Sequence, residues 1–334
     1  MSPHDNWLAL VDEEVVDPDL VIVDPHHHLW RGSRMMGDYV LEDLWADTGS
    51  GHRVEATVFV ECRAQYWTDG PEHLRPVGET EFVAEIAEAS NAGDGATIAG
   101  IVAFADLRLG DLLDEVLEAH VEAGRGLFRG IRHAISRAEH PEILMIPGRA
   151  PAGLHADESF RSGVRRLGEL GHTYESWHYH YQLGEFTELA RAAPGTTIIL
   201  DHFGTPLGVG PYASQRDQIL ATWRADIAEL ARCPNVLAKL GGLAMPDNGF
   251  GWHEADRPPT SDEVVAAHRD VYLHTIDCFG PERCMFESNF PVDRLSVSYR
   301  VLYNALKKMV ADFSDDERTR MFAGTAREAY SLPG

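Results

Sequence analysis

The strongest constraint on the fold is an alternation of two patterns that repeats along the chain. Short runs of apolar and β-branched residues, typical of strands buried on both faces, alternate with longer segments of helical apolar periodicity. A repeated strand–helix unit of this kind is typical of a parallel β/α architecture. We expect eight strands, at residues 21–28, 56–60, 97–104, 127–131, 173–180, 196–200, 236–240 and 283–286.

The segments between these strands favour helices, and the loop lengths indicate which end of the sheet is functional. The loops that enter strands are short, whereas those that leave the first, second, fourth and seventh strands are long. In a barrel the long loops at the carboxyl ends of the strands carry the active site. The expected helices span residues 79–91, 111–123, 158–170, 183–193, 214–232, 260–279, 298–313 and 315–330.

We therefore predict an α/β chain folded as one (β/α)8 TIM barrel. The single domain would cover residues 1–334, with 1–19 as an acidic lead-in and 314–334 as a C-terminal helix. A doubly wound open sheet is the alternative. Eight repeats, and the absence of a Gly-rich phosphate loop after the first strand, favour the barrel.

The net charge limits the classes of partner, and the cysteine spacing indicates the cellular compartment. The 334 residues carry 53 Asp and Glu against 29 Lys and Arg, a formal net charge of -24. This charge argues against nucleic acid and an anionic membrane surface, and leaves a small molecule as the expected partner. No apolar run reaches the roughly 18 residues that a membrane span needs. Because the four cysteines form no CxxC pair, we expect a reducing compartment and a cytoplasmic protein.

Histidines, carboxylates and arginines gather where the expected strands end. His26 and His28 lie two residues apart, so they share one face of the first strand. In a barrel these strand ends converge on one pocket, where histidine can bind a divalent metal, polarise a carbonyl or transfer a proton. Such a pocket suits hydrolysis of an ester, lactone or amide, and decarboxylation could use similar groups. The strand-end residues are His26, His28, Glu61, Arg132, His133, His178, His180, Asp201, His202, Glu287 and Asn289.

Three motifs in order carry a resemblance to a known family. They are Asp24-x-His26-x-His28-Leu29-Trp30, Leu200-Asp201-His202-x-Gly204-x-Pro206 and Phe286-x-Ser288-Asn289-Phe290-Pro291. Together they resemble the amidohydrolase superfamily, in its amidohydrolase-related branch. That branch holds lactonases of sugar lactones and pyrone dicarboxylates, and aromatic-acid decarboxylases. The resemblance covers residues 21–330 and implies a (β/α)8 barrel.

The resemblance also implies roles for individual residues. His26 and His28 match the histidine pair of the first strand, and His202 matches the histidine of the sixth. His180 is the best match for the fifth-strand histidine, with His178 as the alternative. Asn289 stands where the family usually has the aspartate that activates water. Asn cannot act as a general base, although it can orient a water molecule, and Glu287 or Asp293 could replace it.

The resemblance leaves open whether the site binds a metal ion. Many relatives bind zinc, whereas lactonases of this branch can work without a metal. The candidate ligands for one divalent ion, zinc by preference, are His26, His28 and His202. The fourth strand contains no lysine, which excludes a bridging carboxylated lysine of the binuclear type.

The leading hypothesis is a hydrolase that cleaves a lactone or ester of a small carboxylated or polyhydroxylated molecule. Arg132 or Arg129 would hold the anionic group of the substrate, and Glu61 and Glu287 would contact it too. A decarboxylase or C–C lyase on the same barrel is the alternative, with a Schiff base on Lys239 as a weaker variant. A non-catalytic or partner-dependent barrel is a further alternative. A homo-oligomer is the protein assembly that the resemblance suggests.

Overall fold

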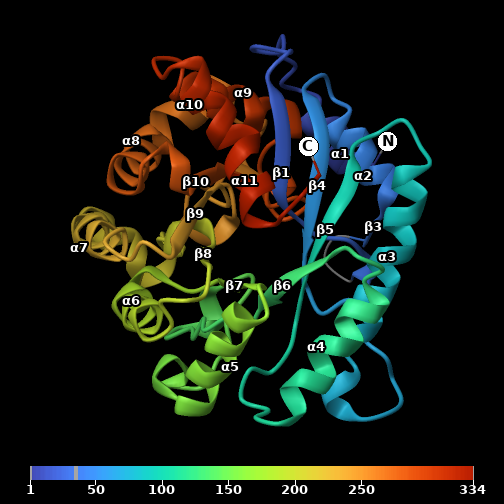
Figure 1. The fold of residues 1–334 in the computed structure, drawn as a ribbon. Helices are drawn as coiled ribbons and strands as arrows, with labels where there is room; N and C mark the ends of the chain where they lie inside the picture. Colours follow the sequence, from blue (N-terminus) through green and yellow to red (C-terminus); the bar gives the residue numbers. More distant parts are fainter. Residues whose placement is uncertain (1, 34–36, 334) are drawn as a thin grey trace.

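The eight expected strands form one parallel sheet in which each strand lies beside the next one along the chain (Figure 1). The structure is a computed structural model that describes residues 2–33 and 37–333. The strands are β1 Val21–His27, β4 Arg53–Val60, β5 Thr97–Ala103, β6 Phe128–Arg132, β7 Thr173–Ser176, β8 Ile198–Leu200, β9 Val236–Leu240 and β10 Cys284–Phe286. All seven pairings within this sheet are parallel.

The sheet curls back on itself because the first strand meets the chain that follows the last. The amide of Asn289 donates to the carbonyl of His26 over 3.0 Å, and the amide of His28 donates to the carbonyl of Phe290 over 2.8 Å. These bonds join β1 to the segment just beyond β10, so the strands form a nearly closed barrel. The predicted (β/α)8 fold is confirmed, and the open doubly wound sheet is wrong.

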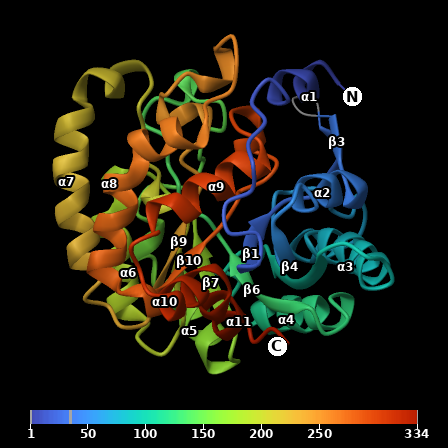
Figure 2. The ribbon, with the colours of Figure 1, turned by 90° about the horizontal axis from the view of Figure 1, so that it is seen from above.

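Helices cover the outside of the barrel (Figure 2). Helix α8 begins as its sequence predicts, because Thr260 and Glu263 form a capping box in which Thr260 Oγ1 accepts from the Glu263 amide. The helices after β4 are α3 Val77–Asn91, α4 Leu112–Ala123, α5 Glu158–Glu169, α6 Leu183–Ala192, α7 Arg216–Leu230, α8 Ser261–Phe279 and α9 Tyr299–Met309.

The C-terminal segment is helical and packs against the barrel. It runs without a break as α10 Asp315–Thr319, a π-helical turn Arg320–Gly324 and α11 Thr325–Ala329, so the expected C-terminal helix is present, with a π-turn in its middle. Tyr330 and Leu332 pack in one apolar cluster with barrel residues such as Val58 and Met285. The chain end therefore covers residues that point into the barrel.

Other departures lie near the chain start and in β7. The lead-in contains α1 Pro3–Leu8, and an antiparallel hairpin of β2 Trp30–Ser33 and β3 Gly37–Tyr39 precedes α2 Leu41–Thr48. Strand β7 ends at Ser176, four residues before the expected end. Among the described residues, no helix is both long enough and apolar enough to cross a membrane.

Candidate active site

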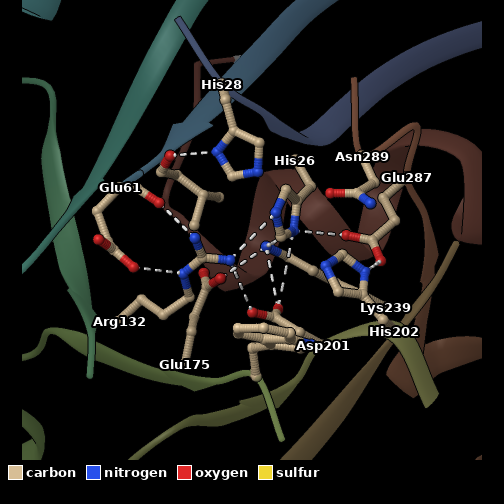
Figure 3. Close-up of polar contacts among 12 residues, drawn as sticks. His26, His28, Glu61, Arg132, Glu175, Asp201, His202, Lys239, Glu287 and Asn289 are labelled. Atoms are coloured by element: carbon tan, nitrogen blue, oxygen red, sulfur yellow. Dashed lines mark hydrogen bonds and ion pairs between the residues drawn. The ribbon is translucent and has the colours of Figure 1, made fainter. Parts of the chain in front are cut away.

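One carboxylate joins two of the strand-end histidines (Figure 3). Glu287 follows β10, and its Oε2 lies 2.7 Å from Nδ1 of His26. Its Oε1 lies 2.7 Å from Nδ1 of His202, which follows β8. Burial alone would lower the pKa of His202, but the carboxylates of Glu287 and Asp201 together outweigh burial and raise that pKa. An imidazole held in this way is oriented by the carboxylate and stabilised when it takes up a proton.

Two glycines after β9 make room for this carboxylate–imidazole pair. At Gly242, where φ is +76°, an added Cβ would lie 2.3 Å from His202 Nδ1. At Gly241 it would lie 2.4 Å from Cγ of Glu287. Glycine is needed here because the backbone must approach both side chains closely. His202 has a left-handed φ of 51°, a conformation that non-glycine residues keep mainly where function requires it.

His28 and His26 take different positions in the same cluster. His28 Nδ1 lies 2.8 Å from the carbonyl oxygen of Val60, so Nδ1 carries the proton and Nε2 keeps its lone pair. The His26 ring is fully buried, with its centroid 5.0 Å from that of His28 and 4.6 Å from that of His202. Burial, and then the charge of Lys239, lower the pKa of His26, which keeps this ring neutral.

Arg132 at the end of β6 is committed to partners within the protein. Its Nε donates to Glu61 Oε1 over 2.9 Å, and Nη2 donates to the Glu61 carbonyl. Nη1 lies 3.3 Å from His26 Nε2 and 3.5 Å from Asp201 Oδ2. The guanidinium therefore neutralises buried carboxylates, which leaves it poorly suited to hold the anionic group of a substrate.

Lys239 on β9 supplies a second buried positive charge. Its Nζ lies 2.7 Å from Glu175 Oε2, 3.6 Å from Asp201 Oδ1 and 3.3 Å from His26 Nδ1. Tyr330, from the C-terminal segment, donates to the other oxygen of Glu175. Burial would lower the pKa of Lys239, but Glu175 and Asp201 raise it. A protonated amine has no lone pair for a Schiff base.

Asn289 faces the cavity and is tied to a buried acid. Its Nδ2 donates to Asp293 Oδ1 over 2.8 Å, and burial raises the pKa of Asp293 to about 7. Asp24 of the first motif accepts from the Ser288 amide over 2.9 Å and from the Tyr299 hydroxyl over 3.0 Å. Asp24 thus fixes the loop that carries Asn289 and does not line the cavity.

Above this cluster lies a cavity of about 810 Å³. His28, Arg132, His202 and Asn289 line it. Its apolar lining includes Trp30, Phe104 and Trp177, as is usual for small-molecule sites. The structure brings seven predicted site residues to this cavity or directly beneath it: His26, His28, Glu61, Arg132, His202, Glu287 and Asn289.

Two predicted site residues lie elsewhere. His180 is not among the residues that line this cavity; it lies in a 3-10 turn, where its Nδ1 accepts from the Leu207 amide over 3.3 Å and its ring packs on Tyr181 and Tyr212. Arg129 lies near the start of β6 and donates to the carbonyls of Gly126 and Ala99 over 2.7 and 3.2 Å. Neither side chain reaches the cluster.

The cluster fits one divalent metal ion in donor type and charge. Ligand atoms of His26, His202 and Glu287 lie within 4.8 Å of one another, as do those of His26, Glu175 and Asp201. Among the described residues, Glu287 Oε2 and Asp201 Oδ1 accept no hydrogen bond, although Glu287 Oε2 lies 2.7 Å from His26 Nδ1 and Asp201 Oδ1 lies 3.6 Å from Lys239 Nζ. The buried carboxylates in contact outnumber the buried cations by two, a charge that a divalent ion would balance. The carboxylates are Glu61, Glu175, Asp201 and Glu287, and the cations are Arg132 and Lys239.

Comparison with known proteins agrees with this arrangement. The family model described as amidohydrolase matches residues 23–332. The chain belongs to the amidohydrolase family. Membership explains why a nearly closed barrel carries its histidines and acids at the carboxyl ends of the strands.

Several amidohydrolase relatives match nearly the whole chain. An uncharacterised protein, y4mH of Sinorhizobium fredii, is 31% identical over 94% of this chain and 99% of its own length. An L-fucono-1,5-lactonase of Burkholderia multivorans is 28% identical over 93% of this chain and 96% of its own. A crystal structure of a Burkholderia multivorans amidohydrolase with bound zinc is 26% identical, with a TM-score of 0.73, over 94% of this chain and all of that one.

Proposed function

We propose that this amidohydrolase hydrolyses the C–O bond of a lactone on a small polyhydroxylated or carboxylated molecule. The observation that carries the proposal is the Glu287–His202 pair at the floor of the cavity, 2.7 Å apart. Two relatives named L-fucono-1,5-lactonase, 28% and 25% identical, support this reaction class. The proposal places the enzyme in the cytoplasm, in keeping with four cysteines that form no disulfide.

The residues at the cavity floor provide each proton transfer. Because Glu287 holds His202 at Nδ1, the Nε2 lone pair takes a proton from the water molecule that attacks the lactone carbonyl. The carboxylate stabilises the imidazolium that forms, as an acid does behind a catalytic histidine. When the ring C–O bond breaks, His202 returns the proton to the leaving oxygen, and the product is a hydroxy acid.

Two further side chains act on the water and the carbonyl. Asn289 lines the cavity, and its amide orients the attacking water. Arg132 also lines it. Its N–H groups remain bound to Glu61 and Asp201, so it acts through its positive charge, which stabilises the negative charge that develops on the carbonyl oxygen. A divalent metal ion, zinc in this proposal, would be held by His26, Asp201 and Glu287. When bound it would lower the pKa of the attacking water, and His202 would remain the base.

The test is hydrolysis of L-fucono-1,5-lactone, D-glucono-1,5-lactone and D-glucono-1,4-lactone. Hydrolysis is measured as acid release above the spontaneous rate. We expect turnover of at least one lactone, and loss of about 100-fold or more in His202→Asn. His140→Asn, in an exposed loop, is the matched control and should keep full activity. Carbon dioxide release from an aromatic acid, without lactone turnover, would instead support the decarboxylase alternative.

A further inference from the structure

The mouth of the cavity carries three exposed arginines. Arg31 lies in β2, Arg63 in the loop after β4, and Arg149 in the loop after β6. All three are exposed and all line the cavity. Within residues 2–33 and 37–333, no carboxylate forms an ion pair or hydrogen bond with any of them.

This mouth is positive although the whole chain is strongly negative. Among the described residues, the cavity lining contains five arginines and two carboxylates. Arg108 is held by Asp106 through two bonds of 2.9 and 2.7 Å, and Arg132 is held by Glu61. The other three arginines remain uncompensated in a protein of formal charge -24. A cleft lined by one sign of charge concentrates ligands of the opposite sign.

The loop that carries Arg63 is held by hydrogen bonds to the buried side chain of Glu79. Arg63 has a left-handed φ of 63°, and the amides on either side of it donate to one buried carboxylate. Glu79 Oε1 accepts from the Cys62 amide over 3.1 Å and from the Ala64 amide over 2.6 Å. Arg63 thus projects from an ordered turn, which reduces the entropy lost when a ligand binds.

Arg149 is held in a similar way on the other side of the cavity mouth. The amide of Gly148 donates to the Tyr179 hydroxyl over 2.7 Å, and the amide of Ala150 donates to the Ser136 carbonyl over 2.8 Å. Both neighbours of Arg149 are therefore anchored, while its side chain remains exposed. The two loops follow different barrel strands, β4 and β6, and both arginines line the same cavity.

We propose that Arg31, Arg63 and Arg149 form an anion subsite that selects substrates with a carboxylate or phosphate distant from the reacting carbonyl. Arginine suits this task because its planar fork bonds such groups with two parallel N–H donors. Arg132 and Arg129 bind acceptors within the protein. In this proposal the subsite, and not these two residues, binds the anionic group of the substrate. The substrate class rests on the proposed function, since the subsite would orient an anionic lactone for hydrolysis at His202.

The first readout compares pairs of lactones that differ only at carbon 6, where one member carries an anionic group and the other a neutral one. D-glucaro-1,4-lactone carries a carboxylate where D-glucono-1,4-lactone has a hydroxymethyl group. 6-Phospho-D-glucono-1,5-lactone and D-glucono-1,5-lactone form the phosphate pair, so the two pairs distinguish the two anions. We expect a higher kcat/KM for the anionic member of at least one pair, and a preference that falls as salt is added.

Substitution of the arginines should remove that preference without harming catalysis. Arg63→Gln and Arg149→Gln should each raise KM for the preferred anionic lactone about tenfold while leaving kcat nearly unchanged. The neutral lactones should be unaffected. Arg232→Gln is the matched control, because it removes one exposed positive charge that pairs with Glu229 at 3.1 Å outside the cavity.

A second readout separates this inference from the proposed reaction. Calorimetry gives the dissociation constants of D-glucarate, a dianion, and D-gluconate, a monoanion, without any turnover. Tighter binding of D-glucarate that Arg63→Gln weakens would support the subsite even if no lactone is hydrolysed. Lactone turnover with equal rates within both pairs, and D-glucarate binding unchanged in both variants, would overturn the subsite while leaving the proposed function intact.

Discussion

Asn289 donates a hydrogen bond from Nδ2 to Oδ1 of Asp293 over 2.8 Å, with both side chains buried. Asn289→Asp would restore the residue usual in the family, but it would place a carboxylate against a second one. Asp293 already has a pKa raised to about 7 by burial. We therefore predict that Asn289→Asp lowers the free energy of unfolding by about 1–3 kcal/mol and lowers kcat/KM.

Urea unfolding and lactone turnover of the same preparation check this prediction. The control is the double variant Asn289→Asp, Asp293→Asn, which restores a carboxylate–amide pair in the opposite orientation and should recover most of the lost stability. A single variant as stable as the wild type and more active would contradict the role assigned to the amide.

Lys239 lies between Glu175 and Asp201 with no exposure to solvent. Removing it leaves Glu175 without its cation and Asp201 with Arg132 alone, so Lys239→Met should lower the free energy of unfolding by about 3–5 kcal/mol. Lys308→Met removes a lysine whose partner, Asp262, is 83% exposed, and should cost less than about 1 kcal/mol. Denaturant unfolding compares the two. Equal, small losses would show that Lys239 is not needed to compensate the buried acids.

Glu79 makes stability depend on pH. Burial, and then repulsion by Glu61, raise the pKa of Glu79 from 4.5 to about 8. Ionisation is thus harder in the folded state than in the unfolded one. The unfolded state loses its proton first as pH rises, so the free energy of unfolding falls between about pH 4.5 and pH 8. The stability present below this window is lost above it.

Glu79→Gln keeps the acceptor oxygen and removes the charge. The free energy of unfolding of this variant, minus that of the wild type, should increase by on the order of 2–4 kcal/mol from about pH 5 to about pH 9. Urea unfolding at both pH values measures the difference. Glu254→Gln, at a side chain that is 80% exposed, should show no such gain. A Glu79→Gln profile parallel to that of the wild type would refute the assigned pKa.

Metal content is the prediction that separates the two forms of the site. Elemental analysis of protein purified without added metal or chelator should find about one divalent ion per chain. His26→Ala should lose that ion, because His26 belongs to both groups of donors. His140→Ala should retain it. Fully active wild-type protein without metal would contradict metal binding by this cluster and leave the metal-free route.

Motifs at strand ends were enough to predict which histidines and which carboxylate lie together at one end of the barrel. His26 and His28 were placed on one side by strand alternation, and His202 and Glu287 by their position after later strands. The barrel itself brings such ends together, so spacing along the sequence and fold class suffice for these residues.

The interior charges could not be predicted in the same way. Lys239 lies between Ala238 and Leu240 on a buried strand, and its partner Glu175 is 64 positions away. Nothing local marks a lysine as the centre of an ion-pair network. His180 was misplaced for a related reason. The resemblance matched His180 to the histidine at the end of an expected strand 173–180, whereas β7 ends at Ser176 and the following turn directs His180 towards Tyr212.

The most direct test of the account is kcat/KM for the lactone that the wild type hydrolyses fastest, measured in the wild type and in Glu287→Gln. Glutamine can keep one hydrogen bond to His202 but cannot stabilise its protonated ring. We predict turnover by the wild type and a loss of about 100-fold or more in the variant, with urea unfolding used to confirm that the variant is folded. Wild-type activity in a folded Glu287→Gln variant would contradict the account.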